Sequence, residues 1–260
     1  MRKQKASVVF AKTREANVAV EKVQYQAGSV TGHGALVWND KVSGKRPLLL
    51  VMPNWLGVTD VAINRAAKMA GDKYVAFVAD MYGDGKTSKG PPESQDLMMA
   101  VRKDRVEGRK RVNAALGAMV AEANKRGIGD ASKKAAVGFC FGGGNVLELA
   151  RSGADLNAVV SLHGDLGTTM PGKKGDFKAA VFVIHGSKDP VAPKAERDAL
   201  EAELDGAEAN WQMLDFGGRL HSFAEEETMM KGVAEYNAPA AHQTFRMLDD
   251  FIQDAFNKKL

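Results

Sequence analysis

A single cysteine lies in a glycine-rich turn near the middle of the sequence. Cys140 stands in the segment Gly-Phe-Cys-Phe-Gly-Gly-Gly at 138–144, after a strand-like run at 134–137 and before a helix-like run at 145–151. A strand, a sharp turn flanked by glycine and a helix lift a nucleophile above the edge of a sheet. The N-terminal N–H groups of the following helix favour a thiolate. The segment therefore predicts a cysteine nucleophile, which needs a base, an acid and an oxyanion hole.

Other functions of this thiol are possible, because a free cysteine is most often a small buried hydrophobe. The glycines on both sides of Cys140 favour the nucleophile. A redox-sensing thiol is a further alternative, which the absence of a second, resolving cysteine disfavours.

The expected acid and base of the site follow two later strands. Asp189 comes after the apolar run that ends at Ile184, and His221 comes after the run that ends at Phe216. Function in open α/β sheets collects beyond the carboxyl ends of the strands. The order nucleophile, acid, histidine is also the chain order of α/β-hydrolase triads. Cys140, Asp189 and His221 are therefore the predicted catalytic residues.

Several residues compete for these two roles. Asp165 and Asp80 are rival acids, of which Asp80 is expected to order its loop. A structural role is favoured for the other four histidines: His33, His163, His185 and His242. The oxyanion hole needs two backbone donors. One is expected to be the N–H of Phe141, directly after the nucleophile, and the other the N–H of Trp55, in the loop after the strand at 47–52.

The elements that must position these residues alternate between strand-like and helix-like runs. Strands are predicted at 18–26, 34–38, 47–52, 74–79, 134–137, 158–162, 180–184 and 211–216. Helices are predicted at 61–70, 145–151, 193–204 and 239–256, with a loop at 83–93 and a long helical region at 95–125 whose weak points are Gly108 and Gly117. This alternation predicts an α/β fold: a mostly parallel, twisted sheet of about eight strands with an antiparallel start and helices on both faces. We expect an N-terminal extension at 1–17 and one domain at 18–260.

Composition excludes several classes of protein. A net charge of +4 spread over 260 residues gives no indication of nucleic-acid binding. One cysteine excludes an internal disulfide, and no Cys/His spacing suits structural zinc. No apolar run approaches the roughly 20 residues that span a membrane. We therefore expect no metal, no cofactor, no membrane contact and a cytoplasmic protein, although a chain that had lost a secretory leader would look the same.

With these residues placed, the chain resembles the dienelactone hydrolase (carboxymethylenebutenolidase-like) family of α/β-hydrolases, from about Val18 to Phe256. The resemblance is carried by Gly-Phe-Cys-Phe-Gly-Gly at 138–143, Ala-Asp-Met-Tyr-Gly at 79–83, His-Gly-Ser-Lys-Asp at 185–189 and His-Ser-Phe-Ala at 221–224. It implies a carboxylic ester hydrolase in which Cys140, Asp189 and His221 form the triad, and Trp55 and Phe141 supply the oxyanion N–H groups.

The sequence departs from the family's pattern at two positions expected to contact substrate. Members that cleave dienelactone carry a glutamate where this chain has Asn54, which cannot act as a base, and a carboxylate-binding arginine where it has Glu225. We therefore expect a small ester or lactone other than dienelactone as substrate. Tyr82 either lines its pocket as a further substrate-binding residue or packs as core. A monomer or weak dimer is expected. The alternative is a non-catalytic relative that acts as a binding protein.

Overall fold

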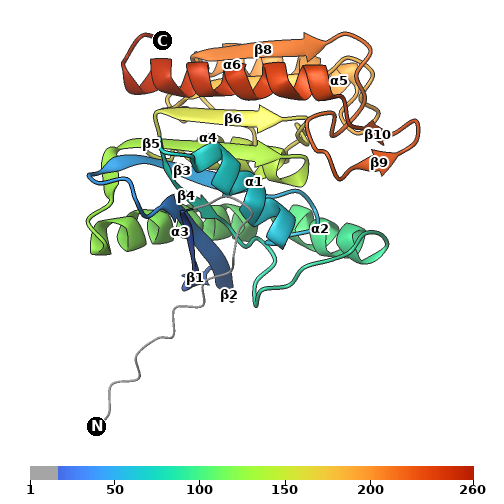
Figure 1. Cartoon of the computed structure of the whole chain (residues 1–260). Helices are drawn as coiled ribbons and strands as arrows, with labels where there is room; N and C mark the ends of the chain where they lie inside the picture. The colour runs from blue at the N-terminus through green and yellow to red at the C-terminus, as the bar shows by residue number, and fades with distance from the viewer. Residues whose placement is uncertain (1–16) are drawn as a thin grey trace.

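A computed structural model describes residues 17–260, and its main element is one eight-stranded sheet (Figure 1). In spatial order the strands are β1 (Val18–Ala27), β2 (Val30–Asn39), β4 (Val75–Val78), β3 (Arg46–Met52), β5 (Gly129–Phe139), β6 (Ala158–Leu162), β7 (Ala180–Gly186) and β8 (Trp211–Phe216). Strand β2 is antiparallel to both β1 and β4, and the other neighbouring pairs are parallel. The predicted mostly parallel sheet with an antiparallel start is confirmed.

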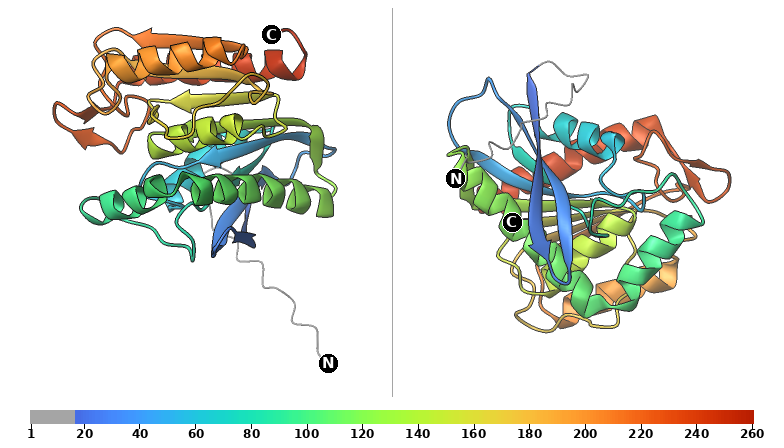
Figure 2. Two further views of the ribbon diagram at one scale, coloured as in Figure 1. Left: turned by 180° about the vertical axis from the view of Figure 1, so that it is seen from behind. Right: turned by 90° about the horizontal axis from the view of Figure 1, so that it is seen from below.

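Helices cover both faces of this sheet. The face seen in Figure 1 is covered by α1 (Asp60–Ala70) and α6 (Ala238–Phe256). The opposite face, seen in Figure 2, carries α2 (Glu93–Lys103), α3 (Arg105–Lys125), α4 (Phe141–Arg151) and α5 (Lys194–Gly206). Successive side chains of a strand point to opposite faces, so each strand contributes side chains to two hydrophobic cores. In β3, Leu48 and Leu50 pack beneath α3 and α4, whereas Leu49 and Val51 pack beneath α1 and α6.

The long helical region is divided at a residue that the sequence prediction passed over. Asp104 has non-helical backbone angles (φ −118°, ψ 84°) and caps α3, because its Oδ1 accepts a hydrogen bond of 2.9 Å from the N–H of Glu107. Gly108 and Gly117, predicted as the weak points, both lie inside α3. The region is therefore two helices, and the first of them begins at Glu93, at the end of the expected loop.

Three further boundaries differ from the prediction. Strand β2 begins at Val30 and β5 begins at Gly129, so both are longer than expected. Helix α4 begins directly after Cys140 and not at Asn145.

A hairpin of β9 (Met229–Met230) and β10 (Ala234–Glu235) was not predicted, because two-residue strands carry no periodicity. The expected extension at 1–17 lies outside the described residues except for Asn17.

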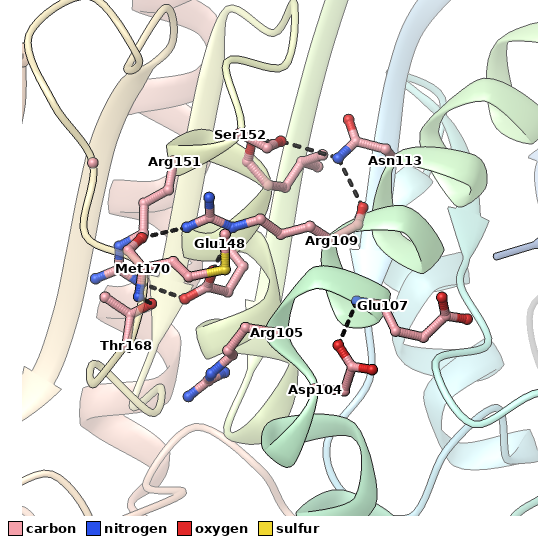
Figure 3. A network of polar contacts seen from close by, with 12 residues as sticks. Asp104, Arg105, Glu107, Arg109, Asn113, Glu148, Arg151, Ser152, Thr168 and Met170 are labelled. Carbon is pink, nitrogen blue, oxygen red and sulfur yellow. Dashed lines mark hydrogen bonds and ion pairs between the residues drawn. The ribbon is translucent and has the colours of Figure 1, made fainter. Parts of the chain in front are cut away.

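A buried polar network fixes α4 against α3 (Figure 3). Glu148 of α4 accepts from Arg109 Nε at 2.7 Å and from Arg151 Nη1 at 3.1 Å. Asn113 of α3 donates to Ser152 Oγ at 3.0 Å. Since each residue of α4 is buried, its charged groups need these partners. The network holds in place the helix whose N-terminus faces Cys140.

Candidate active site

Cys140 occupies the sharp turn between β5 and α4 in a backbone conformation that few residues other than glycine adopt. Its φ is 53° and its ψ is −117°. The turn also requires close backbone approach: a Cβ at Gly138 would lie 2.0 Å from the carbonyl oxygen of Gly142, and a Cβ at Gly142 would lie 2.1 Å from that of Met52. Glycine at both positions therefore allows the turn, as the motif predicted.

The structure brings the three predicted catalytic residues together. His221 Nε2 lies 3.0 Å from Cys140 Sγ, and His221 Nδ1 lies 2.8 Å from Asp189 Oδ2. Asp189 and His221 are both buried, whereas Cys140 is partly exposed. This chain of contacts suits proton transfer between the thiol and the imidazole, with the carboxylate fixing the ring.

The charges of these groups support one another. Burial opposes the charge on His221, but the facing Cys140 sulfur and the hydrogen bond to Asp189 together raise the pKa of His221 to about 10. Burial likewise opposes the charge on Asp189, but His185 and His221 outweigh it and hold the pKa of Asp189 well below its usual value. The arrangement therefore favours an ionised aspartate and a protonated histidine opposite the sulfur.

Backbone contacts hold the acid and the base on their loops. Asp189 Oδ1 accepts from the N–H groups of Val191 at 2.7 Å and Ala192 at 3.3 Å, which leaves Oδ2 for His221. The N–H of His221 donates to the carbonyl of Val233 at 3.1 Å, and the carbonyl of His221 accepts from Glu235 at 3.1 Å. The β9–β10 hairpin therefore forms hydrogen bonds with both the backbone N–H and the backbone carbonyl of His221.

The competing histidines of this region lie beside the site and do not face Cys140. His185 is fully buried, with Nε2 3.1 Å from Asp189 Oδ2. The ring of His163 lies edge-on to that of His221, with 5.5 Å between centroids. Burial, followed by the charge of His221, lowers the pKa of His163 well below its usual value. His163 is therefore neutral and packs against His221.

The competing aspartates have other partners. Asp80 accepts from four backbone N–H groups at 2.9–3.0 Å, those of His33, Tyr82, Gly83 and Gly85, as expected for a loop-ordering residue. Asp165 lies 2.6 Å from Arg102 Nη2 and 3.4 Å from Arg105 Nη2. Neither is placed to orient His221.

The two expected oxyanion donors come from different elements. Trp55 follows β3, and Phe141 opens α4. Neither N–H donates a hydrogen bond to any other residue within 17–260, and both residues line the cavity in front of Cys140. Two free donors beside a nucleophile suit a developing oxyanion.

The cavity in front of Cys140 has a volume of about 110 Å³. Besides predicted residues it is lined by Met98, Arg102, Asp165, Val191, Ser222, Thr228, Met230, Val233 and Ala234. Apart from Cys140 and His221, the charged residues of this lining are Arg102 and Asp165, which pair with each other, and most of the lining is apolar. Sequence reasoning missed Met98, Met230 and Val233, because a helix and a hairpin distant in sequence carry them to the site.

Tyr82 is buried and is not among the described residues that line this cavity, and its contact with substrate stays a prediction. Its ring stacks on that of Phe141 at 5.6 Å between centroids, and its hydroxyl donates to the carbonyl of Trp55 at 2.8 Å. Burial, together with the charge on Cys140 and Asp80, raises the pKa of Tyr82, so the hydroxyl remains a donor. Tyr82 therefore contacts both residues that are expected to supply the oxyanion N–H groups, Trp55 and Phe141.

Glu225 also lies behind the cavity wall and not on it, contrary to the sequence prediction. The side chain is fully buried, and Arg65 Nη1 lies 3.0 Å from its Oε2. Asn54, which does line the cavity, donates to the same oxygen at 2.6 Å. Burial raises the pKa of Glu225, and Arg65 opposes that effect. Because Arg65 balances its charge, Glu225 does not repel an anion in the way that the sequence suggested.

Neither a metal cluster nor a membrane-spanning helix is found in this part of the chain. Among residues 17–260, no three His, Cys, Asp or Glu side chains are grouped to hold a metal ion. No helix in the same range is long and apolar enough to cross a bilayer.

Comparisons with known proteins agree on one family. The model of the dienelactone hydrolase family matches residues 33–256. The solved structure named m3DLH is 32% identical, with a TM-score of 0.84 over 93% of this chain and 100% of that one. The dienelactone hydrolase-like promiscuous phosphotriesterase P91, from metagenomic libraries, is also 32% identical, with a TM-score of 0.83 over 92% and 99%. MGS-M1, an α/β-hydrolase enzyme from a deep-sea metagenome, shares the fold at 18% identity and a TM-score of 0.65, over 92% and 98%.

Proposed function

This chain belongs to the dienelactone hydrolase family, and we propose that it cleaves small ester or lactone substrates through a thioester formed on Cys140. The observation that carries the proposal is the contact chain from Cys140 Sγ through His221 to Asp189, at 3.0 Å and 2.8 Å. Two unused N–H groups beside the sulfur complete the set of groups that acyl transfer needs.

The first half of the reaction forms the thioester. The Cys140 thiolate attacks the carbonyl carbon, and the carbonyl electron pair moves to oxygen, where the N–H groups of Trp55 and Phe141 stabilise it. The C–O bond of the ester then breaks, and the His221 imidazolium gives its proton to the departing alkoxide. Each oxyanion donor is worth about 3 kcal/mol in known enzymes.

The second half releases the acid. Neutral His221 takes a proton from water, the hydroxide attacks the thioester carbon, and the C–S bond breaks to regenerate the thiolate. Asp189 holds the ring and stabilises the imidazolium in both halves. Since Asn54 cannot take a proton, His221 is the base for the whole cycle.

Turnover of p-nitrophenyl acetate tests the proposal. We expect Cys140→Ala and His221→Ala to lower kcat by about 10⁴-fold. The control is His242→Ala, at an exposed histidine of α6. Mass spectrometry should detect one acetyl group on wild-type Cys140 during turnover. Wild-type activity in Cys140→Ala would refute the mechanism, and a complete lack of turnover by the wild type would favour a binding protein or a redox thiol, which peroxide treatment distinguishes.

Asn54→Ala provides a second comparison. If His221 is the sole base, Asn54→Ala costs far less activity than His221→Ala, and comparable losses would contradict the assignment. We further propose that neutral esters are preferred to anionic lactones, because Arg102 is already held by Asp165 and no cation stands at position 225. A panel of esters and lactones that differ in charge measures this preference.

A second candidate activity is hydrolysis of neutral phosphotriesters. It is favoured by the resemblance to P91 over 92% of the chain, together with an apolar cavity in which the cation is paired. The same thiolate would attack phosphorus, the P–O bond to the leaving group would break, and the His221 imidazolium would give its proton to the departing oxygen. Water activated by neutral His221 would then cleave the P–S bond and regenerate the thiolate, with the same N–H groups stabilising the phosphoryl oxygen. Turnover of paraoxon that disappears in Cys140→Ala supports this activity, and its absence in the wild type excludes it.

A further inference from the structure

A fully buried carboxylate lies directly behind the cavity and contacts its own loop and two other parts of the chain. Glu225 Oε2 accepts from Asn54 Nδ2 at 2.6 Å and lies 3.0 Å from Arg65 Nη1, while Oε1 accepts from Ser222 Oγ at 3.2 Å. An unpaired charge at this depth would strongly destabilise the fold, and these three donors offset that effect. Glu225 has no part in the mechanism proposed above, so its burial and its three contacts call for a different role.

The first partner belongs to the oxyanion loop. Asn54 Oδ1 accepts from the N–H of Leu56 at 3.0 Å, so both ends of the amide are engaged, one by its own loop and one by Glu225. Trp55 lies between the two residues of this turn. The position of the Trp55 N–H therefore depends on the contact between Asn54 and Glu225.

The second partner belongs to the histidine loop. Ser222 follows His221 directly and has a φ of 53°, a region that side-chain-bearing residues rarely adopt. Its hydroxyl donates to Glu225, which stabilises the strained turn that aims the imidazole at Cys140. Glu225 is part of this same loop, so its carboxylate connects the loop of the base to the loop of the oxyanion donor.

The third partner supplies the compensating cation. Arg65 projects from α1, pairs with both Glu225 and Glu227, and places its guanidinium 4.7 Å from the centre of the Phe139 ring. Phe139 is the last residue of β5, directly before Cys140. Arg65 therefore neutralises Glu225 and also packs under the nucleophile turn.

We propose that Glu225 is a positioning residue that fixes the oxyanion loop relative to the histidine loop, through Asn54 and Ser222. It does not touch substrate, since Asn54 stands between it and the cavity. The role rests on the proposed hydrolytic function. It predicts a change in kcat and little change in KM, because the catalytic groups move relative to one another while the apolar cavity wall stays in place.

Glu225→Gln tests the proposal, because it removes the charge and preserves the shape. With p-nitrophenyl acetate we expect kcat to fall by about 10- to 100-fold with KM within about twofold, since a misplacement of about 1 Å can cost about 100-fold. Glu226→Gln, at the exposed neighbouring residue, is the matched control and should keep wild-type kinetics. A folded Glu225→Gln protein with wild-type kcat overturns the proposal.

A double-mutant cycle with Asn54→Ala separates positioning from general damage. If Glu225 acts through Asn54, the double variant loses no more activity than the worse single variant. Losses that multiply would overturn the proposal.

If the Glu225→Gln protein does not fold, Ser222→Ala replaces it. The kcat of Ser222→Ala should fall about 3- to 10-fold at constant KM if the proposal holds, and an unchanged kcat refutes it. Cys140→Ala decides the hydrolytic function separately, because wild-type activity in that variant refutes the mechanism whatever Glu225→Gln does.

Discussion

Gly142→Ala is predicted to separate the oxyanion hole from the nucleophile. The added Cβ would lie 2.1 Å from the carbonyl oxygen of Met52 and 2.5 Å from that of Pro53, where ordinary contact begins at 3.4 Å. Both atoms belong to the backbone that leads from β3 into the oxyanion loop. The loop must therefore move away from α4 by about 1 Å, and the Trp55 N–H moves with it.

The expected losses follow from this displacement. Losing one oxyanion donor costs about 10²- to 10³-fold in kcat, so we expect ester turnover to fall by at least about 100-fold. Overpacking costs about 1–3 kcal/mol, and replacing glycine by alanine in a helix returns up to about 1 kcal/mol. The net loss of about 1–2 kcal/mol lowers the Tm by roughly 2–8 °C.

Two assays distinguish this mechanism from unfolding. Hydrolysis of p-nitrophenyl acetate needs the oxyanion hole, whereas alkylation of Cys140 by iodoacetamide needs only the thiolate. We expect alkylation of Gly142→Ala to remain within about threefold of wild type while hydrolysis falls. The control is Gly117→Ala, at an exposed position of α3 where a Cβ meets nothing within 4 Å; it should raise stability by about 0.5–1 kcal/mol at constant kcat. Equal losses of hydrolysis and alkylation, or wild-type hydrolysis, would refute the reasoning.

Three further predictions address the site. Cys140→Ser removes the anionic sulfur opposite His221, so the pKa of His221 falls from about 10, which NMR titration of the imidazole measures; an unchanged pKa would contradict the assigned cause. Tyr82→Phe leaves the carbonyl of Trp55 without its 2.8 Å donor, so unfolding should become easier by about 1 kcal/mol and kcat should fall a few-fold at constant KM; urea unfolding and steady-state kinetics test both. Met98→Ala enlarges the cavity, so kcat/KM for longer acyl esters relative to acetate should rise by about fourfold for each methylene that the new space accepts. A ratio that does not change with chain length would exclude Met98 from the acyl-binding wall.

The parts of the site that the sequence predicted are encoded by short-range patterns. The turn around Cys140 needs only a strand, two glycines and a helix in succession. Asp189 and His221 follow β7 and β8, and the carboxyl ends of parallel strands meet at one edge of a sheet. The order of the residues in the chain and their positions after strands were therefore sufficient to predict that they lie close together.

The parts that the sequence did not predict depend on tertiary contacts. The sequence around Glu225 does not indicate that the side chain is buried, because its neutralising partner, Arg65, comes from a helix early in the chain. The placement of Tyr82 behind Phe141 likewise depends on how two loops pack together. The helix break at Asp104 did have a local signal, an aspartate followed three residues later by glutamate, which resembles a capping box. Gly108 and Gly117 are weak helix formers, but both lie inside α3 and neither ends a helix.

In the β9–β10 hairpin, the backbone contacts His221 and the side chains face the cavity that we propose holds the substrate. Its backbone anchors the peptide of His221, whereas the side chains of Met230 and Val233 face the cavity. Side chains along this segment can therefore vary while the hydrogen bonds that hold the imidazole remain. Such an arrangement is readily evolvable: a library randomised at these two positions should yield enzymes with new substrate ranges and an undisturbed catalytic apparatus.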